Sequence, residues 1–144
     1  MSFFRFIKHV RRPDMDQIEY LTFYYSTGTA MNASVNYVLK QENGQYSVLV
    51  CPSGTAPEKA FLCEVEETFA DEISDVLKKY HVGSWNGFHR ASKHILDGNS
   101  FSLNVHFHSG KSIHAHGYMK WPKNYRTVRS ELDRLFKNIM SRNG

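Results

Sequence analysis

The dipeptide Asn43-Gly44, between two segments of alternating apolar residues, constrains the fold more than any other feature. Both central positions of a type I′ turn need a positive φ, which these two residues adopt readily, so the dipeptide predicts a two-residue β-hairpin. Residues 31–41 alternate between apolar and polar side chains, and the turn sets Leu39 opposite Val48. The turn and the alternation therefore specify one register, in which the apolar faces of both strands coincide.

The remaining strands are predicted from composition and alternation. Residues 17–26 are rich in β-branched and aromatic side chains, and residues 59–66 alternate, so both segments are predicted to be strands. Two more strands are expected on either side of Ser109-Gly110. Residues 85–100 show no regular pattern, and we expect a loop with one helical turn.

Helical periodicity appears twice. After residue 67 the apolar residues recur at helical spacing, with Thr68 as the expected N-cap and Gly83 as the expected stop. A second helix is expected to open at Pro122, because the first helical position tolerates the missing N–H of proline.

The predicted order is ββββ-α-ββ-α, which indicates an α+β fold. Hairpins imply an antiparallel sheet of about six strands, and two one-sided amphipathic helices are expected to cover one of its faces. The length of 144 residues suits one domain, predicted over residues 17–144. Residues 1–16 carry four basic groups in the first twelve positions and are predicted to be a peripheral basic segment.

The hairpin around Ser109-Gly110 holds four of the eight histidines of the chain. If the apolar residues of its two strands face one core, the loop has three residues and Gly110 takes a left-handed conformation in a bulge. That register places His106, His114 and His116 on the opposite face of the sheet, with His108 at its edge or in the turn.

Two readings of these histidines stay open. Imidazoles on adjacent strands reach far enough to share one ion, so His106, His114 and His116, with His108 as a fourth ligand, form a candidate site for zinc or another transition metal. The alternative is the water-facing side of a half-buried hairpin. Residues 98–130 contain no acid, so the hairpin itself offers no carboxylate ligand and no carboxylate to orient a histidine.

Basic residues gather near the chain ends, around an acidic middle. The formal net charge is +4, and residues 120–144 hold seven basic groups against two acids. An anion or a nucleic acid is therefore a candidate ligand of the last helix, with aromatic residues interleaved for base stacking. The opposing interpretation is that these aromatics pack in the core and the charges are solvated. The candidate anion-binding residues are Lys120, Lys123, Arg126 and Arg129.

No short motif of a known enzyme chemistry occurs in the chain, which has no phosphate-binding glycine loop, no nucleophile elbow and no His-Glu-x-x-His. We therefore expect a non-catalytic domain that binds another macromolecule, with a protein favoured over a nucleic acid. No run of eighteen apolar residues and no secretory signal is found, so we expect a cytoplasmic protein without a membrane span. Cys51 and Cys63 are then expected to be reduced thiols.

Two segments carry a resemblance to known proteins. The stretch WNGF…DGNSFSLNV…SGKSIHAHGYMKWPKNY, together with YYSTGTAMNASVNYVL, resembles a family of small uncharacterised bacterial proteins. The similarity runs over most of the chain after residue 16. It implies a compact cytoplasmic domain, and it implies no activity, cofactor or catalytic residue.

Overall fold

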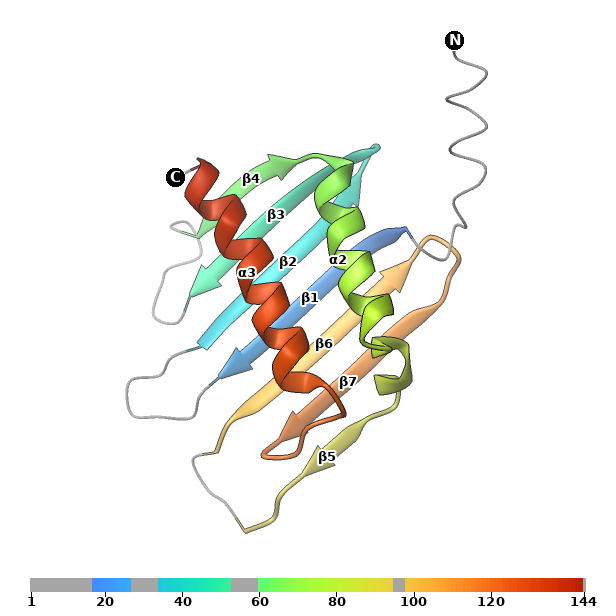
Figure 1. The fold of residues 1–144 in the computed structure, drawn as a ribbon, viewed down its shortest axis with the longest axis vertical. Helices are drawn as coiled ribbons and strands as arrows, with labels where there is room; N and C mark the ends of the chain where they lie inside the picture. The colour runs from blue at the N-terminus through green and yellow to red at the C-terminus, as the bar shows by residue number, and fades with distance from the viewer. Residues whose placement is uncertain (1–16, 27–33, 53–59, 95–97, 144) are drawn as a thin grey trace.

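The computed structural model describes residues 17–26, 34–52, 60–94 and 98–143, which form one twisted sheet with two helices packed on the same face (Figure 1). The α+β prediction is confirmed, although the sheet has seven strands instead of about six. The predicted basic segment 1–16 lies outside the described residues.

The strands follow one another across the sheet in the order β4-β3-β2-β1-β6-β7-β5. All neighbours are antiparallel except β5 and β7, which pair in parallel. The elements are β1 (Ile18–Ser26), β2 (Ser34–Glu42), β3 (Gln45–Pro52), β4 (Phe61–Val65), α2 (Glu67–Lys79), the 3₁₀ helix η3 (Val82–Trp85), β5 (His89–Ala91), β6 (Ser100–Phe107), β7 (Ser112–Tyr118) and α3 (Tyr125–Asn143).

The β2–β3 hairpin has the predicted turn and register. Asn43 and Gly44 both have positive φ, at 53° and 78°, and Leu39 lies opposite Val48. The buried side chains of Tyr37, Leu39, Val48 and Val50 therefore share the face that the helices cover.

Replacing Gly44 with alanine is expected to lower the free energy of unfolding by about 1 kcal/mol, because an L side chain is strained at this φ. Urea denaturation measures the change. The matched control is Gly83→Ala, at a glycine without positive φ and with open space around the added Cβ. The control is expected to leave stability unchanged or slightly higher. Equal losses in both variants would contradict the assignment of strain to the turn.

The β6–β7 hairpin also has the predicted three-residue loop. His106 pairs with Ser112, the Phe107 N–H donates to the Lys111 carbonyl at 2.9 Å, and Gly110 has φ of 93°. This register puts Phe101, Leu103 and Val105 in the core and the histidines of both strands on the other face.

Three predicted boundaries are wrong. The N-cap of α2 is Glu66, not Thr68, because the Phe69 N–H already bonds to the Glu66 carbonyl at 3.0 Å. Gly83 does not end that helix: α2 ends at Lys79, and the residue with left-handed geometry is His81. Pro122 does not open the last helix, because it belongs to a turn in which its carbonyl accepts the Tyr125 N–H.

The expected loop over residues 85–100 is wrong in part. His89–Ala91 forms β5 at the edge of the sheet, held by bonds from the His116 N–H to the Phe88 carbonyl and from the Ser92 N–H to the Tyr118 carbonyl. Because these partners lie far along the chain, local alternation could not predict the strand. The described part of this segment extends the sheet beside β7.

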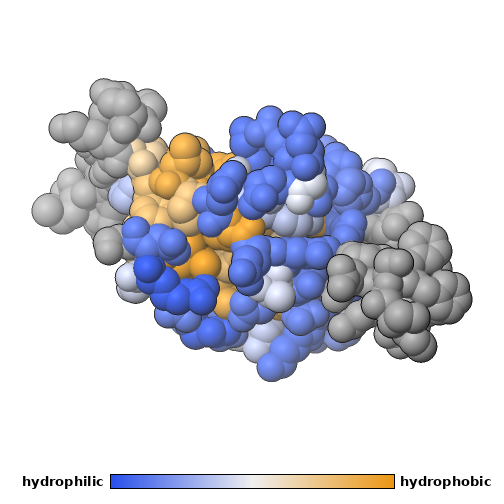
Figure 2. Space-filling model, turned by 90° about the horizontal axis from the view of Figure 1, so that it is seen from above, coloured by the Kyte–Doolittle hydropathy of each residue, from blue (hydrophilic) through white to orange (hydrophobic). Residues whose placement is uncertain are grey.

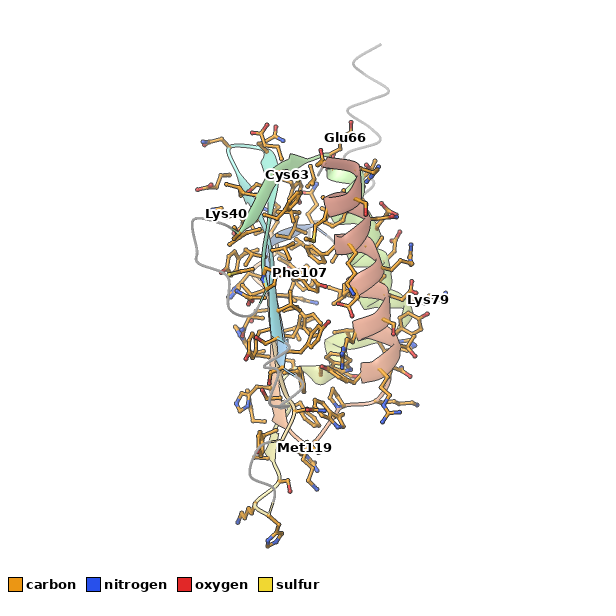
Figure 3. The ribbon with its side chains drawn as sticks, turned by 90° about the vertical axis from the view of Figure 1, so that its left-hand side faces the viewer. Lys40, Cys63, Glu66, Lys79, Phe107 and Met119 are labelled. Carbon is orange, nitrogen blue, oxygen red and sulfur yellow. The ribbon has the colours of Figure 1, made fainter. Side chains whose placement is uncertain are left out.

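The core lies between the sheet and the two helices, where aromatic rings pack densely (Figure 3). Tyr37 of β2 stacks on Phe136 of α3 with ring centroids 4.4 Å apart, and Phe69 of α2 meets the same ring edge-on at 5.3 Å. Trp85, 1% exposed, seals the end of the core near η3. Within the part of the chain described, neither helix has the length and apolar character needed to cross a membrane.

Candidate functional site: the open face of the sheet

Both helices cover one face of the sheet, and no helix or strand of the described residues lies over the other (Figures 1 and 3). We call this second surface the open face. Strand register and burial assign to it the side chains of Tyr20, Thr22, Tyr24, Asn36, Val38, Lys40, Glu42, Ser47, Leu49, Cys51, Leu62, Glu64, His89, Ser102, Asn104, His106, Ser112, His114 and His116.

The open face is poor in charge and rich in rings. Apart from the histidines, Lys40, Glu42 and Glu64 are its charged side chains, and Lys40 lies 3.4 Å from Glu42. Tyr20 and Tyr24 are 40% and 38% exposed, although both lie on β1 near the middle of the sheet. Their rings therefore face solvent where no described helix or strand packs.

The β3–β4 side of the open face is apolar. Val38, Leu49 and Leu62 lie directly opposite one another on three adjacent strands, and we call them the apolar row. Leu62 is 67% exposed. Figure 2, which looks at the molecule from above along the sheet, shows hydrophobic residues gathered toward the left of the view, where β3 and β4 lie, and a mostly hydrophilic remainder.

The β6–β7 side of the open face carries the histidines, as predicted. The rings of His106 and His114 lie 5.1 Å apart, centroid to centroid, and Tyr20 lies 6.3 Å from His106. His114 is fixed by its Nδ1, which donates to the side-chain oxygen of Asn104 at 2.7 Å. The rings of Tyr20, His106 and His114 therefore lie next to one another across β1, β6 and β7.

Sequence reasoning misses one histidine of this surface. In the sequence His89 is a scattered polar position, but β5 brings its ring to within 4.4 Å of the His116 ring. The parallel pairing of β5 with β7 produces this contact, and the sequence around His89 carries no signal of it.

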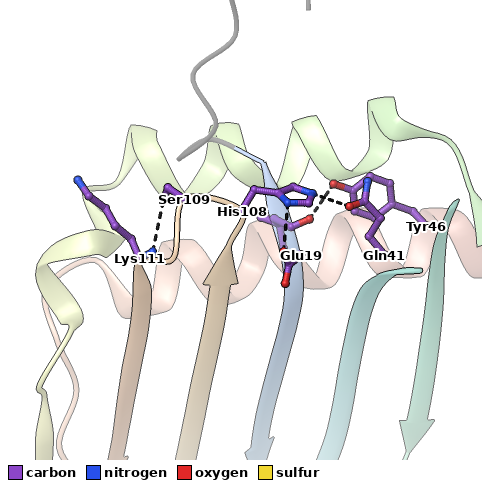
Figure 4. Close-up of polar contacts among 7 residues, drawn as sticks. Glu19, Gln41, Tyr46, His108, Ser109 and Lys111 are labelled. Atoms are coloured by element: carbon purple, nitrogen blue, oxygen red, sulfur yellow. Dashed lines mark hydrogen bonds and ion pairs between the residues drawn. The ribbon is translucent and has the colours of Figure 1, made fainter. Parts of the chain in front are cut away.

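His108 does not join the other histidines (Figure 4). It lies in the β6–β7 turn, with Nδ1 3.1 Å from a carboxylate oxygen of Glu19 and Nε2 2.6 Å from the side-chain oxygen of Gln41. Both ring nitrogens are therefore engaged at the end of the sheet. The hairpin has no carboxylate in its own sequence, and Glu19 of β1 supplies one to His108.

The four predicted metal ligands are thus divided in space. His106 and His114 are adjacent, His116 pairs with His89, and His108 binds Glu19 and Gln41. Within the described ranges, no three His, Cys, Asp or Glu side chains are grouped so that they could hold one ion. Binding of zinc or another transition metal remains a prediction from the sequence.

The predicted anion-binding residues are also divided. Arg126 and Arg129 line a cavity of about 420 Å³ at the start of α3, together with Trp121 and Tyr125. Lys120 and Lys123 are exposed and do not line it. The main chain of Lys123 has a structural role, since its carbonyl accepts a hydrogen bond from the indole of Trp85 at 3.0 Å.

Asp133 organises a polar cluster between the sheet and α3. Tyr37 donates to it at 2.6 Å and Tyr25 at 2.8 Å, and Arg129 lies 4.0 Å from one carboxylate oxygen and 4.0 Å above the Tyr25 ring. Burial and the neighbouring Asp133 raise the pKa of both Tyr25 and Tyr37. These phenols therefore stay protonated and serve as hydrogen-bond donors to Asp133.

The stability of the fold is expected to decline above a pH of about 10, where tyrosine ordinarily titrates. The raised pKa of each buried tyrosine means that the unfolded chain releases protons which the folded chain retains. Above pH 10 the free energy of unfolding then falls by about 1.4 kcal/mol per pH unit for each such phenol. Urea titrations across this range are expected to show a shallower decline in Tyr37→Phe, and an unchanged slope would contradict this origin.

The two cysteines lie on opposite faces of the sheet and are not joined in a disulfide. Cys51 belongs to the open face, whereas Cys63 faces the helices, and burial raises the pKa of the Cys63 thiol.

Comparison of the chain with protein-family models and with curated proteins finds no match in either. The resemblance to small bacterial proteins therefore stays a prediction from the quoted segments.

Proposed function

We propose that this chain is a non-catalytic domain that binds another protein through the open face. One observation carries the proposal: a broad sheet surface is exposed, poor in charge and marked by two exposed tyrosines beside the apolar row. Solvent-facing sheet surfaces usually present polar residues outward, whereas the centres of protein interfaces lose charge and gain tyrosine.

The composition favours a protein over a nucleic acid as the partner at this surface. A nucleic-acid groove presents lysine and arginine to the phosphates, and Lys40 is the one such side chain assigned to the open face. The apolar row would be buried against apolar side chains of a partner, where each leucine contributes about 1.5–3 kcal/mol. We place this binding in the cytoplasm, where thiols such as Cys51 and Cys63 stay reduced.

The test follows a tagged full-length chain by size-exclusion chromatography in extracts of the cells that naturally produce it. Tyr24→Arg and Leu62→Arg each place a charge on the open face and are expected to weaken the complex at least about 100-fold, as substitution of an interface hot spot does. These variants should then elute at the volume of the free tagged chain.

The matched control is Asn138→Arg, which adds the same charge on an exposed position of α3. It should elute with the wild-type complex, and circular dichroism should show that all three variants are folded. If the wild type elutes as the free chain, or if nuclease dissolves the complex, a protein partner at this surface is contradicted.

A further inference from the structure

We propose that the cavity at the start of α3 binds a base–phosphate unit, with the base against Trp121 and the phosphate on Arg126 and Arg129. The cavity has a volume of about 420 Å³ and lies on the helix side of the sheet. It is separate from the open face, so this inference does not depend on the proposed protein partner.

The aromatic wall of the cavity is supported by neighbouring rings and is partly exposed. Trp121 is 36% exposed and stacks on the buried Tyr125, with ring centroids 4.7 Å apart and an interplanar angle of 21°. Phe101 supports both rings, at 5.8 Å from Trp121 and 4.8 Å from Tyr125. A supported indole with an exposed surface is suited to stacking with a planar base.

The two arginines are placed to hold an anion beside that wall. Residues three apart on a helix are neighbours on its surface, so Arg126 and Arg129 lie side by side. Arg129 is held from below by the Tyr25 ring, 4.0 Å away, whereas Arg126 makes no hydrogen bond or ion pair with any residue in the described ranges. A guanidinium matches the oxygen geometry of phosphate, and Arg126 is available for that contact.

Asp133 does not cancel this charge. It also lines the cavity, but its oxygens accept hydrogen bonds from Tyr25 and Tyr37, and its side chain is 18% exposed. One acid against two arginines leaves the lining with net positive charge. The combination of an aromatic surface, two arginines and the amide of Asn99 fits a ligand that has both a base and a phosphate.

The test is a titration of tryptophan fluorescence in the full-length chain. The ligands are adenosine, adenosine 5′-monophosphate, inorganic phosphate and a single-stranded eight-nucleotide oligoadenylate. The monophosphate is expected to quench Trp121 saturably, at concentrations at least about tenfold lower than adenosine or phosphate alone. Oligoadenylate that binds as well as the monophosphate, or better, would identify a nucleic-acid strand as the source of the unit; its failure to bind would identify a free nucleotide.

Matched variants decide whether the signal comes from this cavity. Trp121→Phe should abolish the quench, because the other tryptophan, Trp85, is 1% exposed. Arg126→Ala should weaken binding about 10- to 100-fold, the loss expected for one charge-assisted contact. Arg134→Ala removes an exposed arginine of α3 that pairs with Glu131 and should leave binding unchanged.

Three results would overturn the proposal. They are the absence of a saturable quench with any of the four ligands, a quench that persists in Trp121→Phe, and equal losses in Arg126→Ala and Arg134→Ala. Loss of the protein complex in the open-face variants leaves this titration unaffected, so the two proposals fail independently.

Discussion

Phe136→Ala is expected to lower the free energy of unfolding by about 3–5 kcal/mol, the largest loss we predict for a single substitution. The Phe136 ring is fully buried, stacks on Tyr37 at 4.4 Å and meets Phe69 edge-on at 5.3 Å. Its removal leaves a cavity between the sheet and both helices, which the rigid aromatic neighbours cannot fill. Equilibrium denaturation in urea measures the loss.

The control for this prediction is Tyr20→Ala, which removes a ring of comparable size from the open face. Tyr20 is 40% exposed, and we expect a loss of about 1 kcal/mol or less. Similar losses in the two variants would mean that the open face is packed in the folded chain, which contradicts its assignment as a solvent-facing surface.

Asp133→Leu is expected to cost about 2–3 kcal/mol, because the hydroxyls of Tyr25 and Tyr37 lose the carboxylate to which both donate. The loss reflects two donors left without an acceptor at a position where leucine offers none. Thermal and urea denaturation of the variant measure it.

A double-mutant comparison isolates this cause. In a background with Tyr25→Phe and Tyr37→Phe, neither donor remains, so Asp133→Leu is expected to cost much less than in the wild type. An equal cost in both backgrounds would show that Asp133 stabilises the fold through other contacts, such as that with Arg129.

The parts of the fold that the sequence predicts are those with a local cause. The Asn43-Gly44 turn and the alternation beside it specify one register without reference to the rest of the chain. Gly110 does the same for the second hairpin, because only a three-residue loop keeps the apolar faces together. β5 escapes prediction, since its three residues are ordered by main-chain bonds to β7, a partner more than twenty residues away.

The same distinction applies to the candidate sites. Alternation alone places His106, His114 and His116 on the open face, and burial confirms that arrangement. Pairing of β5 with β7 is needed to bring His89 to His116, and β1 and β2 are needed to occupy His108. These histidine contacts join segments that are distant in the sequence, and a local sequence pattern does not predict them.

The apolar row shows why the sequence does not reveal the open face itself. The hairpin register sets Val38 opposite Leu49 on the face away from the core, but the pairing of β4 with β3 is needed to align Leu62 with them. Together with the exposed tyrosines of β1, they make a surface that differs from the charged exterior of the two helices. This contrast between the two sides is the physical basis of the proposed function.

The most direct test of that function is site-specific photocrosslinking in the cells that naturally produce the chain. A photoreactive phenylalanine analogue replaces Tyr24 in one variant and Asn138, on the exposed side of α3, in another. We predict a discrete covalent adduct with one protein from position 24 and none from position 138. Adducts of equal yield from both positions, or none from position 24, would contradict the assignment of the open face as the binding surface.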